Sequence, residues 1–561
     1  MYGFGNSTAE DWVQTLLHKH YSTYVITDDG EIVLNSTVVK DKEVTSDGAG
    51  NKTYTLRIHD DLKWSNGEAI TAEDYVFTLL WHASKEWNDA GAASDIGTGL
   101  LGYTEYHQGS TDRFPGVQLM DEYTFSLTIA ADRLPYFHET KYVAVYPSYQ
   151  KGWSPASQID SSPDGAKLSA DNADWTLAQD MEQIVQKELN APTVTSGPFT
   201  FESFQEDSIT LKANPRFKGD YKGQKPQLDT IIIKDISSQS DVESCVNGDI
   251  DAVTGVTEAD KIDLAQADTT IDTNYYHVNF FAGLNFHCDF GPTQHKEVRR
   301  AMAHLINRQE LIDQIWYGHA SIVNSMYSLD QWMYIENKDT IDALPEFTLD
   351  VTKANDLLDQ SPYKFEADGE TPFDPAKADN QADYHRHNDQ GEELTINHLD
   401  TEDGGTIVSP LAAQLQETAP QAGIDWQMDR TDFNTLLNHY NEGHLMPEGQ
   451  RRYHSFQLVT GFTEEFDPYL LYHTNMLDEF NSQRLSDPEL DEIMVNMRSL
   501  DPEQREEFLA EWVKFQSRWN VLLPTVPTYS SHNYDVYHKD VQGYRNTPFV
   551  SWADLICEIS K

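Results

Sequence analysis

The stretch WSNGEAITAEDYVF, residues 64–77, places the end of a strand, a tight turn and the start of a helix next to one another. The preceding residues 52–58 alternate their side chains with a period of two, which is the pattern of a half-buried strand. The Asn-Gly pair at 66–67 suits the turn, because glycine adopts a positive φ at little steric cost. Thr71, followed three residues later by Asp74, has the spacing of a helix N-cap, and an apolar stripe follows it. This stretch predicts a mixed α/β chain, and nothing in it is catalytic.

Strand and helix patterns alternate along the rest of the chain, which favours an α/β architecture. The expected elements are strands at 198–204, 208–213, 228–234 and from 248, an extended aromatic run at 275–286, and helices at 239–247, 297–315 and 502–520. For the last helix, Asp501 is expected as the N-cap with Pro502 at the first helical position. Residues 364–392 carry many charges, proline and histidine without a period, which predicts a surface insertion.

The composition describes a large, folded and very acidic protein. Its 561 residues are enough for two to four domains, and 39% hydrophobic with 11% aromatic residues excludes a disordered chain. Forty Lys and Arg against 92 Asp and Glu give a net charge of −52, so the surface repels nucleic acid and anionic lipid headgroups. This acidity is interpreted as solubility outside the cell, while a cationic ligand and a salt-adapted source remain alternatives.

Cysteine and hydrophobic runs add two exclusions. Cys245, Cys288 and Cys557 are far apart and have no metal-binding spacing, so at most one disulfide can form and buried free thiols are expected. No run approaches the ~20 apolar residues that a membrane-spanning helix needs. The chain begins MYGFGNSTAED, without the charged and apolar regions of an export signal.

Four segments together resemble one protein family. Residues 64–77 and the strand before them are similar to the LRxxxKWSDGxPxTAxDVxF signature of the family 5 extracellular solute-binding proteins, which include oligopeptide- and dipeptide-binding proteins of ABC importers. Residues 196–234, 298–313 and 486–529 resemble three further blocks of the same family, in the family's order. The resemblance covers the chain from about residue 21 to its C-terminus.

The resemblance implies a fold of two lobes. This is the periplasmic-binding-protein-like α/β fold in its large form, with mixed sheets, flanking helices and an accessory domain. The implied division is a first lobe from residues 1–35, 190–278 and 525–561, an accessory domain of that lobe at 36–189, and a second lobe at 279–524. Two strands are expected to cross between the lobes near 276–283 and 523–529 and to act as the hinge, which the aromatic and β-branched residues of both stretches suit.

The resemblance also implies a function without catalysis. A bacterial substrate-binding subunit of this family captures a short peptide between its lobes and delivers it to the membrane permease of an ABC importer. It is expected to be a monomer without a cofactor, extracellular, and either lipid-anchored at the cell surface or periplasmic, with the native signal and anchor cysteine removed and Met1 added. The alternatives are an oligosaccharide, a nickel chelate or another small solute as ligand, a signalling receptor, and a hydrolase that reuses the fold. No GxSxG, HExxH, phosphate-loop or dinucleotide motif is present.

The ligand's charged ends suggest where its binding residues lie. An enclosed peptide must have its polar groups paired, so a binding site supplies strand-like hydrogen bonds and a carboxylate for the ammonium. In relatives that acid is an Asp in a GWxxDYxDP motif, and the matching stretch here is GFTEEFDPYLLY, residues 461–472, with Phe462 in place of Trp. Glu464, Glu465 and Asp467 are therefore the candidates for the acid, and a solvated acidic loop is the alternative.

Four tyrosines and a threonine in the first part of the chain are the next candidates for ligand binding. Tyr21, Thr23 and Tyr24 fall where the first lobe of relatives meets the ligand. Tyr103 and Tyr106 fall where relatives place an aromatic ring over the groove. A ring that carries a hydroxyl suits a wet pocket that tolerates different side chains, whereas packing inside the lobe is the alternative for each residue.

Two basic groups complete the candidates. Arg451 and Arg452 lie shortly before the acidic stretch and are candidates for binding a ligand carboxylate, with a structural salt bridge as the alternative. The run His385-Arg386-His387 has residues that could bind a metal, but it lies in the expected insertion without a neighbouring cysteine, so no metal site is predicted.

Overall fold

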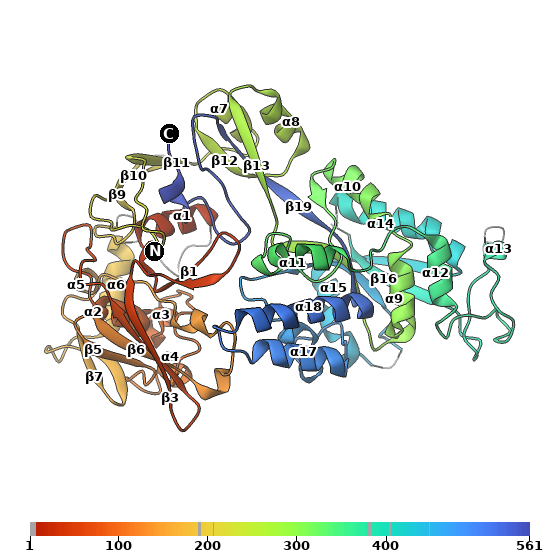
Figure 1. Ribbon diagram of the computed structural model, residues 1–561, viewed down its shortest axis with the longest axis horizontal. Helices are drawn as coiled ribbons and strands as arrows, with labels where there is room; N and C mark the ends of the chain where they lie inside the picture. The colour runs from red at the N-terminus through yellow and green to blue at the C-terminus, as the bar shows by residue number, and fades with distance from the viewer. Residues whose placement is uncertain (1–6, 189–191, 206, 379–382, 403–404, 448) are drawn as a thin grey trace.

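The computed structural model describes residues 7–188, 192–205, 207–378, 383–402, 405–447 and 449–561, and it has two lobes (Figure 1). The first lobe carries four small sheets and the start of the chain, and the second is built around strands in the later half. The C-terminal segment returns to the first lobe, where Ala553 O lies 3.1 Å from His20 Nε2. The first lobe is thus made from discontinuous parts of the chain.

The elements from the start of the chain to the first crossing between the lobes are α1 (Thr8–Leu17), β1 (Tyr24–Ile26), β2 (Ile32–Leu34), β3 (Val39–Ser46), β4 (Lys52–Ile58), α2 (Ala72–His82), α3 (Lys85–Asp89), α4 (Tyr103–His107), β5 (Val117–Asp121), β6 (Thr124–Ile129), α5 (Gln150–Trp153), β7 (Gln158–Ser162), β8 (Gly165–Ser169), α6 (Leu177–Glu188), β9 (Phe199–Gln205), β10 (Ser208–Ala213), β11 (Thr230–Lys234), α7 (Asp241–Val246), β12 (Ala252–Val256), α8 (Ala259–Ala267) and β13 (Ile271–His277).

The elements after it are β14 (Phe280–Phe286), α9 (Lys296–Ala303), α10 (Arg308–Trp316), β15 (Ala320–Ser321), α11 (Trp332–Asp342), α12 (Val351–Leu358), α13 (Pro375–Ala378), β16 (Thr395–Thr401), α14 (Gly405–Thr418), β17 (Asp425–Thr431), α15 (Phe433–Glu442), β18 (Ser455–Gly461), α16 (Tyr469–Tyr472), α17 (Pro488–Arg498), α18 (Arg505–Leu522) and β19 (Thr525–His538).

The strand, turn and helix expected around residues 52–82 are confirmed. β4 lies inside the antiparallel sheet β3-β4-β6-β5, and α2 packs against that sheet. Thr71 is the N-cap of α2 and forms a capping box with Asp74, whose Oδ2 accepts from Thr71 N at 2.9 Å. Tyr75 stacks on Phe125 of β6 at 5.4 Å, which fixes the helix to the sheet.

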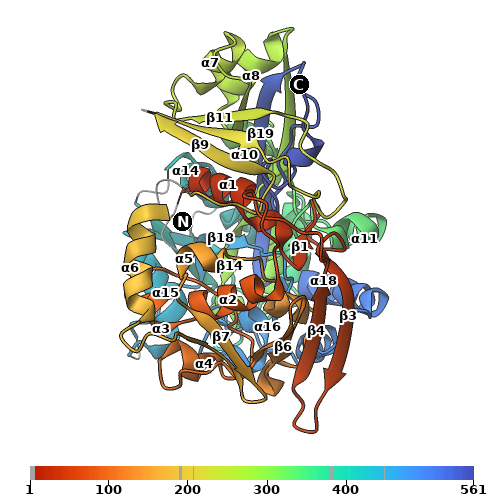
Figure 2. The ribbon, with the colours of Figure 1, turned by 90° about the vertical axis from the view of Figure 1, so that its left-hand side faces the viewer.

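One large mixed sheet connects the lobes (Figures 1 and 2). Its strand order is β12-β19-β14-β18-β16-β17, with β13 and β15 also paired to β19. The first part of β19 pairs with β14 up to Tyr529, and its last part pairs with β13 from His532 onward. The chain therefore crosses between the lobes twice, side by side, at 278–279 and 530–531. The first crossing lies inside the expected span, and the second lies just beyond 523–529.

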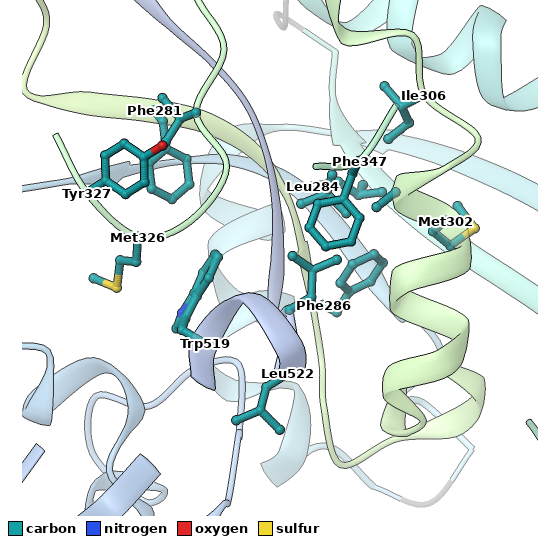
Figure 3. Close-up of a cluster of buried hydrophobic side chains, with 14 of the residues drawn as sticks. Phe281, Leu284, Phe286, Met302, Ile306, Met326, Tyr327, Phe347, Trp519 and Leu522 are labelled. Atoms are coloured by element: carbon teal, nitrogen blue, oxygen red, sulfur yellow. The ribbon is translucent and has the colours of Figure 1, made fainter. Parts of the chain in front are cut away.

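The core of the second lobe packs helices against β14 (Figure 3). Phe281, Leu284 and Phe286 of β14 meet Trp519 and Leu522 of α18 in one cluster of buried side chains. Burying a large apolar side chain stabilises a fold by roughly 1.5–3 kcal/mol, so this cluster contributes strongly to the stability of the second lobe.

Two expected helices differ from the structure. The helix expected at 297–315 is two helices, because Asn307 accepts from Glu310 N at 3.2 Å and caps a new start. The helix expected from Pro502 starts at Arg505. Its expected cap, Asp501, instead directs its carboxylate to Lys52 Nζ of the first lobe at 2.6 Å.

The expected insertion at 364–392 is anchored from within. Arg386 is fully buried, donates to Asp359 Oδ1 at 2.7 Å and to Ala422 O at 2.9 Å, and lies over the Phe373 ring. The five N–H donors of one guanidinium suit this role, since each can satisfy a separate acceptor. The insertion is thus held to the second lobe by a buried cation.

The three cysteines are free, and Cys245 and Cys557 are buried as expected while Cys288 is partly exposed. In the part of the chain that the structure describes, no helix has the length and apolar character to cross a membrane.

Candidate functional site

A cleft of about 610 Å³ receives residues from both lobes. Its first-lobe wall includes the rings of Tyr24, Tyr142, Tyr146 and Phe549, and the second lobe contributes Glu464 and Glu465. This volume lies within the roughly 300–1,000 Å³ of small-molecule sites, and the combination of rings with a few polar groups is typical of such sites.

The three candidate acids have different surroundings. Glu465 forms an ion pair with Lys141 of the first lobe at 3.0 Å, and Asp467 forms one with Arg498 at 3.3 Å. Glu464 forms no ion pair among the described residues, although it is only partly exposed. It is therefore the acid of the three whose charge is left without a cationic partner.

The pKa values follow from this arrangement. Burial raises the pKa of Glu464, and the negative charges of Glu465 and Asp95 raise it further while Lys141 opposes them. Asp95 lines the same cleft from the first lobe, so two carboxylates from opposite lobes repel each other there. Burial also raises the pKa of Asp467, against the effect of Arg498. A cationic ligand group would relieve the repulsion between Asp95 and Glu464.

Phe462 holds the acidic stretch to the first crossing. Phe462 N donates to Asn279 O at 2.9 Å, and Asn279 Nδ2 donates to Phe462 O at 2.7 Å. The Phe462 ring packs beside Phe281 at 5.8 Å. These contacts place Phe462 behind Glu464, outside the residues that line the cleft.

Of the three candidates near the start of the chain, Tyr24 lines the cleft. Its hydroxyl is buried and has no hydrogen-bond partner among the described residues, and burial raises its pKa. Tyr21 is fully buried, where its hydroxyl accepts from Lys218 N at 2.6 Å. Thr23 is also fully buried and donates to Val143 O at 2.8 Å. Tyr21 and Thr23 therefore stabilise the segment from which Tyr24 lines the cleft.

Tyr103 and Tyr106 lie in the accessory region away from the cleft lining. Tyr106 donates to Leu80 O at 2.7 Å, and Tyr103 stacks on His107 at 5.1 Å. Both contacts are those of side chains that pack within one lobe, and a ligand role for these residues stays a prediction.

Arg451 and Arg452 have acidic partners in the second lobe. Arg451 pairs with Asp289, which Arg484 also contacts, and Arg452 pairs with Asp429 at 2.6 Å. Neither arginine lines the cleft. A role in binding a ligand carboxylate stays a prediction for both.

Other groups with the potential for metal binding or catalysis lie outside the cleft. Within the described ranges no group of three metal-ligating side chains lies together, and His385 pairs with Glu393. Ser455 Oγ lies 3.0 Å from His398 Nδ1, and His398 Nε2 lies 3.5 Å from Asp400 Oδ2, in the order of a nucleophile, base and acid. None of the three is more than 2% exposed, so a substrate does not reach them.

Several residues that line the cleft were not among the residues predicted from the sequence. Arg133, Lys141 and Tyr142 lie on the segment between β6 and α5, and Tyr221 and Asp554 come from two more distant segments. They follow no spacing pattern, because their neighbourhood exists only once separate parts of the chain dock. The single available signal was the scarcity of cations, which makes Lys141 conspicuous beside tyrosines.

The comparisons with known proteins agree on one family. The family described as bacterial extracellular solute-binding proteins, family 5 Middle, matches residues 35–448. The oligopeptide-binding protein OppA of Lactococcus lactis subsp. cremoris (strain SK11) is 24% identical over 528 residues, which cover 88% of this chain and 77% of OppA.

Solved structures show the same fold at low identity. The periplasmic murein tripeptide-binding protein MppA, in its unliganded open form, has a TM-score of 0.70 at 15% identity and covers 99% of this chain and 94% of its own. NikA from Brucella suis, in complex with Fe(III)-EDTA, has a TM-score of 0.62 at 15% identity with 98% and 95% covered. With more than two thirds of its length inside the family match, the chain belongs to the family 5 extracellular solute-binding proteins of bacteria.

Proposed function

We propose that this protein binds a short peptide in the cleft between its lobes, outside the cell, and delivers it unaltered to the membrane permease of an ABC importer. The observation that supports the proposal is Glu464, a partly buried carboxylate without a cationic partner in a cleft walled by tyrosines. We also propose that the protein is a monomer and that it is either anchored by a lipid at the cell surface or free in the periplasm.

Glu464 suits the ammonium of a peptide. A charge-assisted hydrogen bond to an ionised group contributes roughly 1.5–3 kcal/mol, and closure around the ligand strengthens it by excluding water. The rings of Tyr24, Tyr142 and Tyr146 offer an amphipathic surface to side chains of different kinds. This pairing of one fixed charge with tolerant walls suits a ligand whose main chain is constant and whose side chains vary.

The proposed mechanism is closure of two rigid bodies. The first body is the first lobe with the accessory domain at 36–189, and it takes β19 only beyond the second crossing; residues 525–529 pair with β14 and so belong, with 279–524, to the other body. The crossings at 278–279 and 530–531 are the hinge. A ligand drives closure only by the difference between its affinities for the closed and open forms, so contacts from both lobes are required.

Calorimetry tests the ligand class. The panel contains trialanine, pentaalanine, the same peptides with acetylated amino groups, maltotriose and nickel–histidine. We expect saturable heat with the free peptides, and a loss of about ten- to hundredfold in their affinity for Glu464→Gln. The acetylated peptides should bind the variant and the natural protein alike.

Glu479→Gln is the matched control, because Glu479 is an exposed acid of the second lobe outside the cleft. Binding of maltotriose or the nickel complex alone would reject the peptide proposal. An equal loss for free and acetylated peptides in Glu464→Gln would reject Glu464 as the ammonium partner.

A further inference from the structure

The lobes also meet at a third place, away from both the cleft lining and the crossings. We name this contact the clasp. It consists of Lys52 and Phe137 of the first lobe and of Arg498, Asp501 and Phe508 at the corner between α17 and α18 of the second. In Figure 1, α17 and α18 reach toward the first lobe at this corner.

The apolar part of the clasp is an aromatic stack. The rings of Phe137 and Phe508 lie 3.8 Å apart and nearly parallel, at 10°. Phe137 N also donates to Arg498 O at 2.8 Å, so main chain joins main chain across the two lobes. Phe137 is 8% exposed and belongs to the buried cluster of the second lobe, where it is the one described member that precedes Phe281 in the chain.

The polar part of the clasp is centred on Lys52. Its Nζ lies 2.7 Å from Glu139 Oε1 of its own lobe and 2.6 Å from Asp501 Oδ1 of the other. Glu139 is fully buried and also accepts from the Tyr54 hydroxyl. Lys52 therefore joins a buried carboxylate of one lobe to a carboxylate of the other.

The segment that carries Phe137 also reaches the cleft. Arg133, Lys141 and Tyr142 of this segment line the cleft, and Lys141 pairs there with Glu465 of the second lobe at 3.0 Å. One short piece of chain is thus fixed to the second lobe at Phe137 and faces the ligand space a few residues later. At Phe137, this segment contacts the second lobe directly and not through a ligand.

We propose that the arrangement of the lobes in this structure, with residues of both lobes around the cleft, is the closed, ligand-binding one, and that Phe137 is a positioning residue that holds it and so raises the affinity for every ligand by the same factor. The proposal rests on the proposed function, in which the closed form binds the ligand. Separating the lobes would expose both rings of the stack to water, which favours the closed form whether or not the cleft is filled. The measured affinity is the intrinsic affinity multiplied by the fraction of closed protein. Removing the Phe137 ring lowers that fraction and therefore reduces the affinity for all ligands by the same factor.

The test compares Phe137→Ala with Phe204→Ala, a substitution of the same residue type at a first-lobe position that is 63% exposed. Small-angle X-ray scattering of the ligand-free proteins measures closure. Calorimetry with trialanine and pentaalanine measures affinity. For Phe137→Ala we expect a larger radius of gyration and a loss of about ten- to hundredfold in affinity, equal for the two peptides. Phe204→Ala should match the natural protein, and Phe137→Leu should lie between them.

Three outcomes overturn the proposal. An unchanged radius of gyration in Phe137→Ala removes the claim that this residue holds the lobes together. An unchanged affinity removes its link to binding. A change in the ratio of the two affinities makes Phe137 a ligand contact instead of a positioning residue. If neither peptide binds the natural protein, the peptide proposal fails, while the scattering of the ligand-free proteins still decides whether Phe137 controls closure.

Discussion

The crossings and the clasp join the same two lobes by different kinds of contact. At the crossings, β19 hydrogen-bonds to β14 over its first part and to β13 over its last part. At the clasp, most contacts are made by side chains, together with the main-chain hydrogen bond from Phe137 N to Arg498 O. A ladder of main-chain bonds breaks only when the sheet unfolds, whereas side-chain contacts separate when the lobes move apart. The crossings are thus a permanent joint between the lobes, and the clasp is a reversible one. Residues of both lobes line the cleft.

The first prediction breaks the permanent joint. A side chain at Gly283 would overlap Thr525 Cγ2 of β19 and lie 3.1 Å from Val526 O. Thr525 is fully buried and cannot move aside, so Gly283→Val should lower the free energy of unfolding by about 3 kcal/mol, measured by urea denaturation. Gly461→Val is the control, because a Cβ there meets nothing closer than Asn279 O at 4.0 Å. Equal losses in both variants would show that the crossing is not tightly packed.

The second prediction opens the reversible joint with acid. His138 lies edge-on against Phe508, and burial lowers its pKa from 6.5 to about 4, although the charge of Glu465 opposes the shift. Lys141 acts in the same direction as burial. The exposed imidazole of the open form binds a proton more readily, so the closed form loses stability as the pH falls from about 6.5 toward 4. The full loss is at most ~3 kcal/mol.

Scattering between pH 7.5 and 5 measures this opening. We expect the radius of gyration of the natural protein to rise below pH 6.5, and His138→Gln to show a smaller dependence on pH because glutamine does not titrate. His59→Gln replaces a partly exposed histidine of the same lobe, outside the clasp, and should behave like the natural protein. An identical pH profile for His138→Gln and the natural protein would exclude His138 as the group responsible.

The third prediction removes the bridging cation. Lys52→Met leaves the buried Glu139 with the Tyr54 hydroxyl as its remaining described partner, and an unpaired buried carboxylate costs about 2 kcal/mol. We expect that loss in the free energy of unfolding, together with a larger radius of gyration. Lys40→Met changes an exposed lysine on the neighbouring strand and should have little effect. Adding Glu139→Gln to Lys52→Met should recover part of the stability, and no recovery would show that the buried charge is not the cause.

The parts of the fold that follow from local sequence were predictable. β4, the turn and α2 depend on a period of two, an Asn-Gly turn and a capping box, all within one short stretch. The break before α10 also had a local signal, Asn307 with Glu310 three residues on, which the continuous apolar stripe of the helix concealed. Asp501 shows the limit. Its position suggested a helix cap, but its carboxylate binds a lysine that lies 449 residues away in the chain.

The candidate site divides in the same way. Glu464, Glu465 and Tyr24 line the cleft and were found through resemblance to family motifs. Lys141 was not found, because its role depends on how the accessory region docks on the second lobe. Phe137 was also invisible from sequence, since an apolar residue beside Tyr136 reads as the core of its own lobe. Contacts between bodies have no period along the chain, so they emerge only from the three-dimensional arrangement.

The smallest predicted effect comes from a surface ion pair beside the clasp. Lys42 Nζ lies 3.4 Å from Glu503 Oε1 across the lobes, with the two side chains 28% and 70% exposed. Water and salt screen such a pair, and two mobile side chains lose entropy in forming it, so Lys42→Met should change the free energy of unfolding by only ~0.3 kcal/mol. The effect should disappear in 1 M NaCl, whereas the loss caused by Lys52→Met should persist because Glu139 remains buried. If Lys42→Met opened the protein as far as Lys52→Met does, the clasp would be held by long-range attraction between exposed charges. The buried stack and the buried carboxylate would then not be the contacts that hold the lobes together.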